Sequence, residues 1–357
     1  MSLRVALVGG PMYDGLYRSL GLFDEVEVIV HADHPTLNRE LARRLGAGER
    51  LDLIATHSKY APSQAAWLTP LEESLDEVDL DAFAERALAL CRWQGRLLSL
   101  PRNIDVRTLW VDADAVPAVP TTWTDLDASG LAFGFTGRDS GLFGTFFEVV
   151  TAWGGRLFTP DGTPALVSDV AGDALTMLRR LAGRLPESQA EWHYDDVDIA
   201  LGAGVVPMAA AWPGGTAALR ATTAGPRLRP HPYFDGISYS GCHSWAIPTT
   251  CGDLPGAVAL LGRLGSATAH RVDAVAGTVP ARTDVLAAIQ PADAVDAARW
   301  DVLRRTIADG MITYPPLNRF PEIEDACWST IRDVLVGRTA LGDALGIMQA
   351  AAIAACA

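Results

Sequence analysis

Residues 95–126 constrain the fold more than any other part of this sequence. A strand-like run ends at Leu100-Pro101 and leads into the polar residues 102–105, and an apolar segment at 108–111 follows. A proline-rich turn at 117–120 then interrupts the chain, because proline cannot continue the hydrogen-bond ladder of a strand. We therefore expect the regions before and after this turn to build separate parts of the fold.

The first region alternates strand and helix signals. The expected strands are 4–8, 26–30 and 51–55, and the expected helices are 14–20 and 36–45, with Thr36 as the N-cap of the second helix. This alternation predicts a mainly parallel sheet with helices on its faces. Ligands bind beyond the carboxyl ends of parallel strands, so the loops 9–13 and 56–60 are expected to lie at a binding edge.

The second region also mixes strand and helix patterns. Strands are expected over 131–135 and 240–248, and helices over 142–153, 173–183 and 255–264. The string Trp212-Pro213-Gly214-Gly215 predicts an exposed loop. The alanine-rich tail after Leu341 predicts a packed terminal helix, because Asp343 and Gln349 interrupt its apolar run and leave it too short for a membrane span.

Several motifs occur in the order typical of one known family. Gly95 precedes Leu100-Pro101 with the spacing Gly-x-x-x-x-Leu-Pro, and residues 120–126 read Pro-x-Thr-Trp-x-x-Leu. Residues 277–282 read Gly-x-x-Pro-x-Arg, and a glycine followed by an Ala-Leu helix closes the chain at 334–345. Together these motifs resemble the family 1 extracellular solute-binding proteins, the sugar-capturing, maltose-binding-protein-like subunits of ABC importers. One departure is Val205, which stands where that family usually has a lysine.

The resemblance implies an α/β protein with the two-lobed periplasmic-binding-protein-like fold (type II). Each lobe would be a mainly parallel sheet flanked by helices, and the chain would cross between lobes several times. The implied boundaries are 1–109 plus about 245–290 for the N-terminal lobe, about 112–240 plus 295–357 for the C-terminal lobe, and hinges near 108–111, 241–248 and 290–295.

The implied function is reversible binding of a sugar or related polar metabolite in the inter-lobe cleft, with hinge closure, for ABC-type import. The protein would act as a monomer without catalysis, and its partners would be a carbohydrate ligand and the membrane subunits of the importer. Two alternatives stay open. One is a cytoplasmic ligand-binding sensor or storage protein of the same fold, and the other is a sugar-acting hydrolase or transferase.

Length, composition and charge limit the possible domain organisation, partners and location. A length of 357 residues favours two domains, and 49% hydrophobic residues suffice for sizeable cores. A net charge of −14 argues against a nucleic-acid partner. Residues 1–4 run directly into the first expected strand without a secretory signal. We therefore expect either an extracytoplasmic protein trimmed of its leader or a cytoplasmic relative.

Sugar binding needs aromatic faces for the C–H side of the ring and polar groups for its hydroxyls. Trp212 ranks first among the aromatic candidates because its Pro-Gly-Gly context favours exposure. Lys59 is the only lysine and follows an expected parallel strand. Its ammonium favours a ligand that carries an acidic group. The arginines of the candidate region could equally bind the hydroxyls of a neutral sugar. The predicted ligand-binding residues are Tyr13, His57, Lys59, Tyr60, Asp105, Arg138, Trp212, Gly214, His243, Trp245 and Arg319.

The residue spacings do not match the motifs of a catalytic serine, a metal site or a redox cysteine pair. Ser140 lies between glycines but not in a Gly-x-Ser-x-Gly motif, and His31 and His34 lack an identifiable third metal ligand. No Cys-x-x-Cys pair occurs among the five cysteines, and Cys242 could bond to Cys251 only if the chain turned between them. We therefore expect no catalytic residue, no metal and no cofactor.

Overall fold

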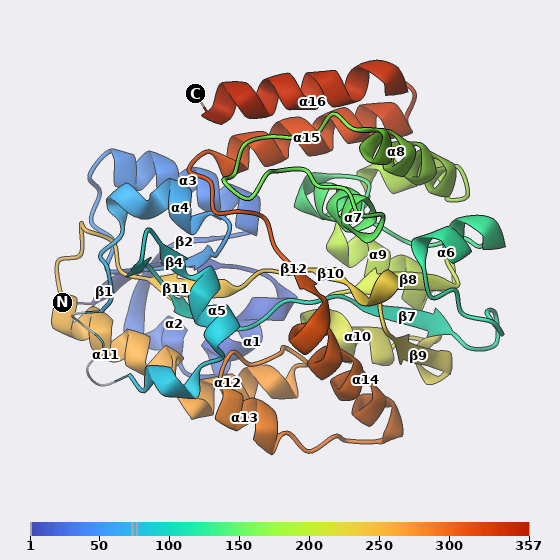
Figure 1. The fold of residues 1–357 in the computed structure, drawn as a ribbon. Helices are drawn as coiled ribbons and strands as arrows, with labels where there is room; N and C mark the ends of the chain where they lie inside the picture. Colours follow the sequence, from blue (N-terminus) through green and yellow to red (C-terminus); the bar gives the residue numbers. More distant parts are fainter. Residues whose placement is uncertain (1, 73–74, 76–77, 357) are drawn as a thin grey trace. The chain divides into compact units, whose positions relative to one another are not determined.

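The computed structural model describes residues 2–72, 75 and 78–356; Met1 and Ala357, the ends of the predicted lobes, lie outside the described residues. The chain forms two compact units, and its course can be followed in Figure 1. The first unit comprises Met1–Asp105 and Gly241–Gln290, and the second comprises Val106–Ser240 and Pro291–Ala357. The chain therefore passes between the units three times, and each unit joins segments that are distant in sequence.

The first unit is built on a five-stranded sheet. Its strands are β1 (Leu3–Val8), β2 (Val26–Ala32), β3 (Leu53–His57), β6 (Leu100–Pro101) and β11 (His243–Ala246), in the order β2-β1-β3-β11-β6. β1 pairs in parallel with β2 and β3, whereas β11 runs antiparallel to both β3 and β6. β3 is buried along its whole length, which explains its apolar sequence. It ends two residues later than expected, because pairing with β11 extends it through His57.

Helices and short turns complete the first unit. They are α1 (Pro11–Ser19), α2 (Leu22–Glu25), α3 (His34–Gly46), α4 (Ala61–Gln64), α5 (Glu85–Leu90), α11 (Leu254–Leu264), α12 (Ala267–Val275), α13 (Thr283–Ala288), the 3₁₀ turns η1 (Ala65–Trp67) and η2 (Leu80–Ala82), and the hairpin β4 (Arg92–Trp93) and β5 (Arg96–Leu97). α3 packs against β1 and β2. The predicted cap of α3 was wrong: Asp33 is the N-cap, and its carboxylate accepts the Thr36 N–H at 3.0 Å.

The second unit has a smaller, antiparallel sheet. β7 (Thr108–Asp112) lies between β8 (Met208–Ala211) and β9 (Leu228–His231) and is antiparallel to both, so a mainly parallel sheet does not describe this unit. β10 (Ser238–Tyr239) and β12 (Met311–Ile312) form a short parallel pair. The expected strand at 131–135 is absent: only Gly134 bridges to β8, and a Cβ there would lie 3.0 Å from Val206 and 3.1 Å from Ala209. The chain can therefore approach β8 this closely at position 134 only because the residue is glycine.

Helices make up most of the second unit. They are α6 (Trp123–Ser129), α7 (Asp139–Ala152), α8 (Asp169–Ala182), α9 (Tyr194–Gly202), α10 (Thr216–Arg220), α14 (Ala294–Arg305), α15 (Phe320–Leu335) and α16 (Leu341–Cys356), joined by the short turns η3 (Glu187–Glu191), η4 (Pro213–Gly215), η5 (Gly225–Arg227), η6 (Phe234–Gly236) and η7 (Thr306–Gly310). α7 is buried from Gly141 to Val150, which accounts for its mainly apolar sequence; Thr145 and Glu148 are the polar exceptions. α15 and α16 lie side by side (Figure 1), which confirms the packed terminal helix. None of the helices in the described residues is long and apolar enough to cross a membrane.

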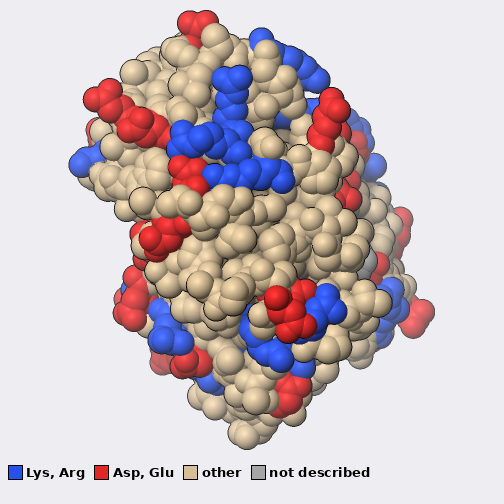
Figure 2. Space-filling view, turned by 90° about the vertical axis from the view of Figure 1, so that its right-hand side faces the viewer, with Lys and Arg blue, Asp and Glu red and all other residues tan. Residues whose placement is uncertain are grey.

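Charged side chains of both signs are interspersed on the surface. On the face drawn in Figure 2, basic and acidic groups occur together with wide uncharged areas between them. The net charge of −14 is therefore not concentrated there as one acidic field.

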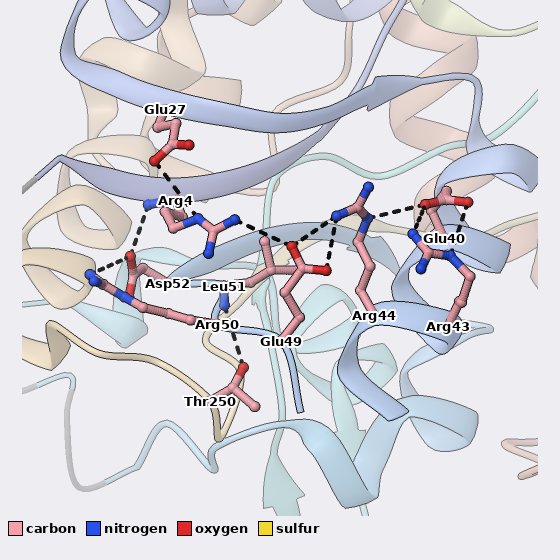
Figure 3. Close-up of polar contacts among 10 residues, drawn as sticks. All are labelled: Arg4, Glu27, Glu40, Arg43, Arg44, Glu49, Arg50, Leu51, Asp52 and Thr250. Atoms are coloured by element: carbon pink, nitrogen blue, oxygen red, sulfur yellow. Dashed lines mark hydrogen bonds and ion pairs between the residues drawn. The ribbon is translucent and has the colours of Figure 1, made fainter. Parts of the chain in front are cut away.

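One polar network fixes the start of β3 in the first unit (Figure 3). The Asp52 side chain, fully buried, accepts hydrogen bonds from the backbone N–H groups of Arg4 and Gly252, each at 2.8 Å. Arg50 donates to the same carboxylate from Nε at 3.1 Å and from Nη2 at 2.9 Å. Burial would raise the pKa of Asp52, but these hydrogen bonds outweigh it and lower the pKa below its ordinary value. Asp52 thus ties β1, β3 and the segment after β11 together.

We expect Asp52→Asn to lower the free energy of unfolding by about 2–4 kcal/mol, because charge-assisted bonds to a buried carboxylate are lost. Urea unfolding at pH 7 measures the change. Glu27→Gln is the matched control: Glu27 lies on the same sheet and pairs with Arg4 at 3.7 Å, but its side chain is 59% exposed. It should change stability by less than about 0.5 kcal/mol. Equal effects of the two substitutions would contradict the assignment.

Candidate functional site

The first unit gathers polar and aromatic side chains at one edge of its sheet. α1 and α3 follow β1 and β2, and His57 is the last residue of β3, so these segments meet at the carboxyl ends of parallel strands. β11 runs in the opposite direction and brings its first residue, His243, to the same edge. We call this group the edge cluster; it consists of Tyr13, His34, His57, Lys59, Tyr60, Asp105 and His243.

Three histidines form the centre of the edge cluster. His57 and His243 face each other directly across β3 and β11, and their ring centroids are 5.0 Å apart. The His34 ring lies 5.5 Å from His57 and 5.1 Å from His243. Neither ring nitrogen of His34 has a hydrogen-bond partner among the described residues. Histidines scattered in the sequence are therefore brought into mutual contact by the fold.

Phenol and carboxyl groups surround the imidazoles. The Tyr13 hydroxyl lies 3.1 Å from His243 Nε2, and the Asp105 carboxylate lies 3.4 Å from the same nitrogen. Asn103 holds both neighbours, because its amide nitrogen donates to Asp105 at 2.8 Å and its oxygen accepts the His243 N–H at 2.8 Å. On the other side Tyr60 lies 5.1 Å from His34, and the Lys59 ammonium lies 4.9 Å from the Tyr60 ring centre.

Burial sets the charge of the edge cluster. It lowers the pKa of His34 to about 3, and Lys59 contributes to the same shift. Burial and neighbouring cations also place the pKa values of His57 and His243 well below the ordinary range. Burial raises the pKa of Asp105 to about 7. Near neutral pH the histidines are uncharged, so each ring offers one donor and one acceptor.

His57, Asp105 and His243 could also be considered as metal ligands, because they offer ligand atoms within 4.8 Å of one another. Electrostatics opposes this. Lys59 and Arg102 both lower the pKa of His243, and a field that disfavours a proton disfavours a divalent cation as well. His57 Nδ1 also accepts the Lys59 N–H at 3.2 Å, so the proton of its neutral ring lies on Nε2. The arrangement is therefore better suited to hydroxyl groups than to a metal ion.

The second unit has a pocket of different character, which we call the aromatic pocket. Its lining residues come from β7, β8, α9 and the segments beside them: Arg107, Phe135, Thr136, Tyr194, Val197, Asp198, Ala210 and Trp212. The Trp212 ring, half-buried, stands edge-on to Tyr194 at 6.0 Å and to Tyr239 at 6.2 Å. The Tyr194 hydroxyl is 2.5 Å from the Ser140 hydroxyl. Burial, followed by Asp195, raises the pKa of Asp198 to about 7.

Arg107 lines the aromatic pocket beside Trp212 and is held by several polar contacts. Its guanidinium lies 5.1 Å from the Trp212 ring centre and donates to Thr145 Oγ1 at 2.9 Å and to the Gly141 carbonyl at 3.2 Å. Glu148, fully buried, pairs with it at 3.4 Å. A Cβ on Gly144 would lie 2.9 Å from both Arg107 Nη2 and Tyr239 Cδ1, so the helix can approach this closely only at a glycine.

Most of the predicted ligand-binding residues lie in one of two separate groups, one in each unit. Tyr13, His57, Lys59, Tyr60, Asp105 and His243 all lie in the edge cluster. Trp212 lines the aromatic pocket, with Gly214 in the turn η4 beside it, and Arg138 is the N-cap of α7 and lies 3.8 Å from Asp139.

Two predicted residues lie elsewhere. Trp245 is 1% exposed and packs edge-on against Tyr17 in the core, with the two ring centroids 6.1 Å apart. Arg319 is exposed at the start of α15 and pairs with Glu322 at 2.6 Å. We therefore remove Trp245 and Arg319 from the candidate site.

Sequence reasoning missed His34, Arg107, Tyr194 and Asp198 as site residues. His34 follows β2 just as Lys59 follows β3, so the argument from strand ends could have found it. Nothing in the sequence marks Tyr194 or Asp198, because their place in the pocket depends on how α9 packs against β8. Arg107 directly precedes the expected hinge at 108–111, but its contact with Trp212 joins residues distant in sequence and could not be predicted from local patterns.

Comparisons with known proteins identify the fold. No protein-family model matches the chain. Maltose-bound T. maritima MalE3 is similar with a TM-score of 0.89 and 20% identity over 99% of both chains. The GacH receptor of Streptomyces glaucescens gives 0.84 and 16% over 100% of this chain and 99% of its own, and a ribitol-bound ABC transporter solute-binding protein from Agrobacterium radiobacter gives 0.83 and 19% over 98% and 97%. The chain has the two-lobed α/β fold of maltose-binding-protein-like solute-binding proteins, which confirms the predicted fold class.

We expect His34 to make stability depend on pH. Its pKa is about 3 in the folded chain and near 6.5 when unfolded, so between these values only the unfolded chain binds the proton. The free energy of unfolding should therefore fall with decreasing pH below about 6.5, by up to about 1.4 kcal/mol per pH unit from this residue. Urea unfolding from pH 8 to pH 5 should show a shallower loss for His34→Gln than for the wild type.

The control for this experiment is His31→Gln, which changes an exposed histidine that pairs with Asp14 at 2.8 Å on the same unit. This variant should retain the steeper dependence of the wild type. A stability difference between wild type and His34→Gln that stays constant with pH would show that His34 does not titrate as the structure requires.

Proposed function

We propose that this chain binds a sugar or a related polar metabolite reversibly, in the cleft between its lobes, and delivers it outside the cytoplasm to the membrane subunits of an ABC importer. The observation that carries the proposal is the edge cluster. Five separate segments supply neutral imidazoles, phenols and a carboxyl group at the ligand-binding edge of a sheet. Sugar hydroxyls both donate and accept hydrogen bonds, and neutral imidazoles do the same.

The aromatic pocket supplies the complementary chemistry. Trp212 is only half-buried and borders a pocket that also contains Tyr194, Asp198 and Thr136. An indole beside polar groups suits the apolar C–H face of a sugar ring together with its hydroxyls. We propose that the edge cluster and the aromatic pocket each hold part of the ligand.

The ligands named for structures of this fold define a first screen. They include maltose, acarbose, α-D-tagatose and ribitol. A thermal-shift screen should contain these compounds and sugar acids of similar size. A ligand at 100 times its Kd stabilises the folded chain by about 2.7 kcal/mol, which such a screen detects. Turnover of a bound sugar instead of reversible binding would contradict the proposal and favour an enzyme.

We expect Trp212→Ala to weaken binding of the ligand found in this screen by about 1–3 kcal/mol, because a stacking face is lost. Isothermal titration measures the affinity, and a melting curve reports on the fold. Trp328→Ala is the matched control, since Trp328 lies on α15 of the same unit and its indole N–H donates to Asp325 at 3.0 Å. If Trp212→Ala binds normally but melts much lower, Trp212 is a core residue.

We expect Lys59→Met to reduce affinity about tenfold or more, because hydrogen bonds to charged groups contribute about 1.5–3 kcal/mol. Methionine keeps the apolar stem and removes the ammonium. The reduction should be greater for an acidic ligand than for a neutral analogue. Arg319→Met removes an exposed cation from the other unit and should leave both affinities unchanged. Unchanged affinity of Lys59→Met for both ligands would show that Lys59 is a solvated surface residue that does not contact the ligand.

A further inference from the structure

Two buried cysteines of the first unit lie in contact. The sulfur atoms of Cys91 and Cys242 are 3.7 Å apart, although 151 positions separate them in sequence. Cys91 is 1% exposed and caps the end of α5, and Cys242 is fully buried and directly precedes β11. Both are free thiols. The sequence offered Cys251 as the partner of Cys242, but the fold places Cys91 beside it instead.

The surroundings of Cys91 are polar where a core would ordinarily be apolar. The hydroxyls of Ser99 and Ser244 are buried and have no hydrogen-bond partner among the described residues. Burial alone would raise the pKa of the Cys91 thiol, but its contact with Cys242 and the nearby side chains of Ser99 and Ser244 bring that pKa below the ordinary value. Burial and the proximity of Cys91 raise the pKa of Cys242 well above its ordinary value.

We propose that Cys91 and Cys242 form a thiol pair that a small disulfide, such as oxidised glutathione, converts to an intramolecular disulfide while the chain folds, before both thiols are buried. The Cys91 thiolate attacks one sulfur of oxidised glutathione, which gives a mixed disulfide and releases one glutathione thiolate. Cys242 then attacks the Cys91 sulfur, loses its proton and releases the second glutathione. The protein loses two protons and two electrons, and glutathione leaves as two thiols.

This bond would brace the strand that carries His243. The Cys242 carbonyl accepts the Ser58 N–H at 2.8 Å, and the Cys242 N–H donates to Ser58 Oγ at 3.2 Å. A Cys91–Cys242 disulfide would therefore hold the end of α5 against the junction of β3 and β11. The sulfurs would need to approach by about 1.7 Å to reach disulfide length. The proposal does not depend on the proposed sugar binding, and no ligand enters its test.

The test uses the full chain and glutathione alone. The protein is unfolded in urea, refolded by dilution into mixtures of reduced and oxidised glutathione, denatured with N-ethylmaleimide, and analysed by intact mass and peptide mapping. We expect a linked Cys91–Cys242 peptide pair and maleimide on the three other cysteines. Cys251→Ala should retain the link, and Cys242→Ala should abolish it. Free Cys91 and Cys242 at every glutathione ratio in correctly refolded protein, or a link to Cys251, would overturn the proposal.

A second measurement needs no substitution, so it holds even if a cysteine variant fails to fold. The fraction of linked wild-type chain is measured against the glutathione ratio in buffer and, separately, in concentrated urea. Because the fold holds the two sulfurs in contact, the equilibrium constant for the link should be at least tenfold greater in buffer than in urea. Equal constants would show that the fold does not favour the bond and would also overturn the proposal.

Discussion

The first unit depends on a backbone clamp between two segments that leave it. The Asp105 N–H donates to the Gly241 carbonyl at 3.0 Å, and the Gly241 N–H donates back to Asp105 at 3.3 Å. The outgoing chain and the returning chain are therefore bonded to each other at the border of the unit. β11 enters the sheet from this clamp, between β3 and β6. Gly241 is required here because a Cβ would lie 2.2 Å from His57 Cε1. The position of His243 opposite His57 and that of Cys242 against Cys91 follow from the same register.

Two buried ion pairs anchor the first crossing, one in each unit. Arg102 forms a two-point contact with Asp273 at 2.7 and 2.9 Å, within the first unit. Arg107 pairs with Glu148 in the second unit. Removing one partner of such a pair leaves a buried charge, which costs about 3–5 kcal/mol, so both anchors are strongly held. Between the two arginines, Asp105 belongs to the backbone clamp with Gly241, so main-chain hydrogen bonds also hold this segment to the first unit.

Local signals in the sequence were sufficient for much of the fold. Apolar runs and helical spacing located β1, β2, α3, α8 and α11 to within a few residues, because one face or both faces of each element are buried. The local signals failed where pairing between distant segments decides whether a strand forms and where it ends. The segment 131–135 has strand composition but room for only one bridge to β8, and β3 extends through His57 because β11 lies beside it. The same limit applies to the site: positions after strands pointed to Tyr13 and Lys59, whereas the contacts among His34, His57 and His243 exist only once the sheet has formed.

The electrostatics of the edge cluster bear on the class of ligand. Its histidines are held neutral by burial, and Lys59 lowers the pKa of all three, while Arg102, which is paired with Asp273, also lowers that of His243. Asp105 has a pKa of about 7, so near neutral pH it is close to the point of half-protonation. A neutral sugar would find balanced donors and acceptors. An acidic ligand would meet the Lys59 ammonium and would favour the protonated form of Asp105, so its binding would be coupled to proton uptake at that carboxyl group. Under the proposed function, burial of Asp105 would thus allow one arrangement of side chains to accommodate both kinds of ligand.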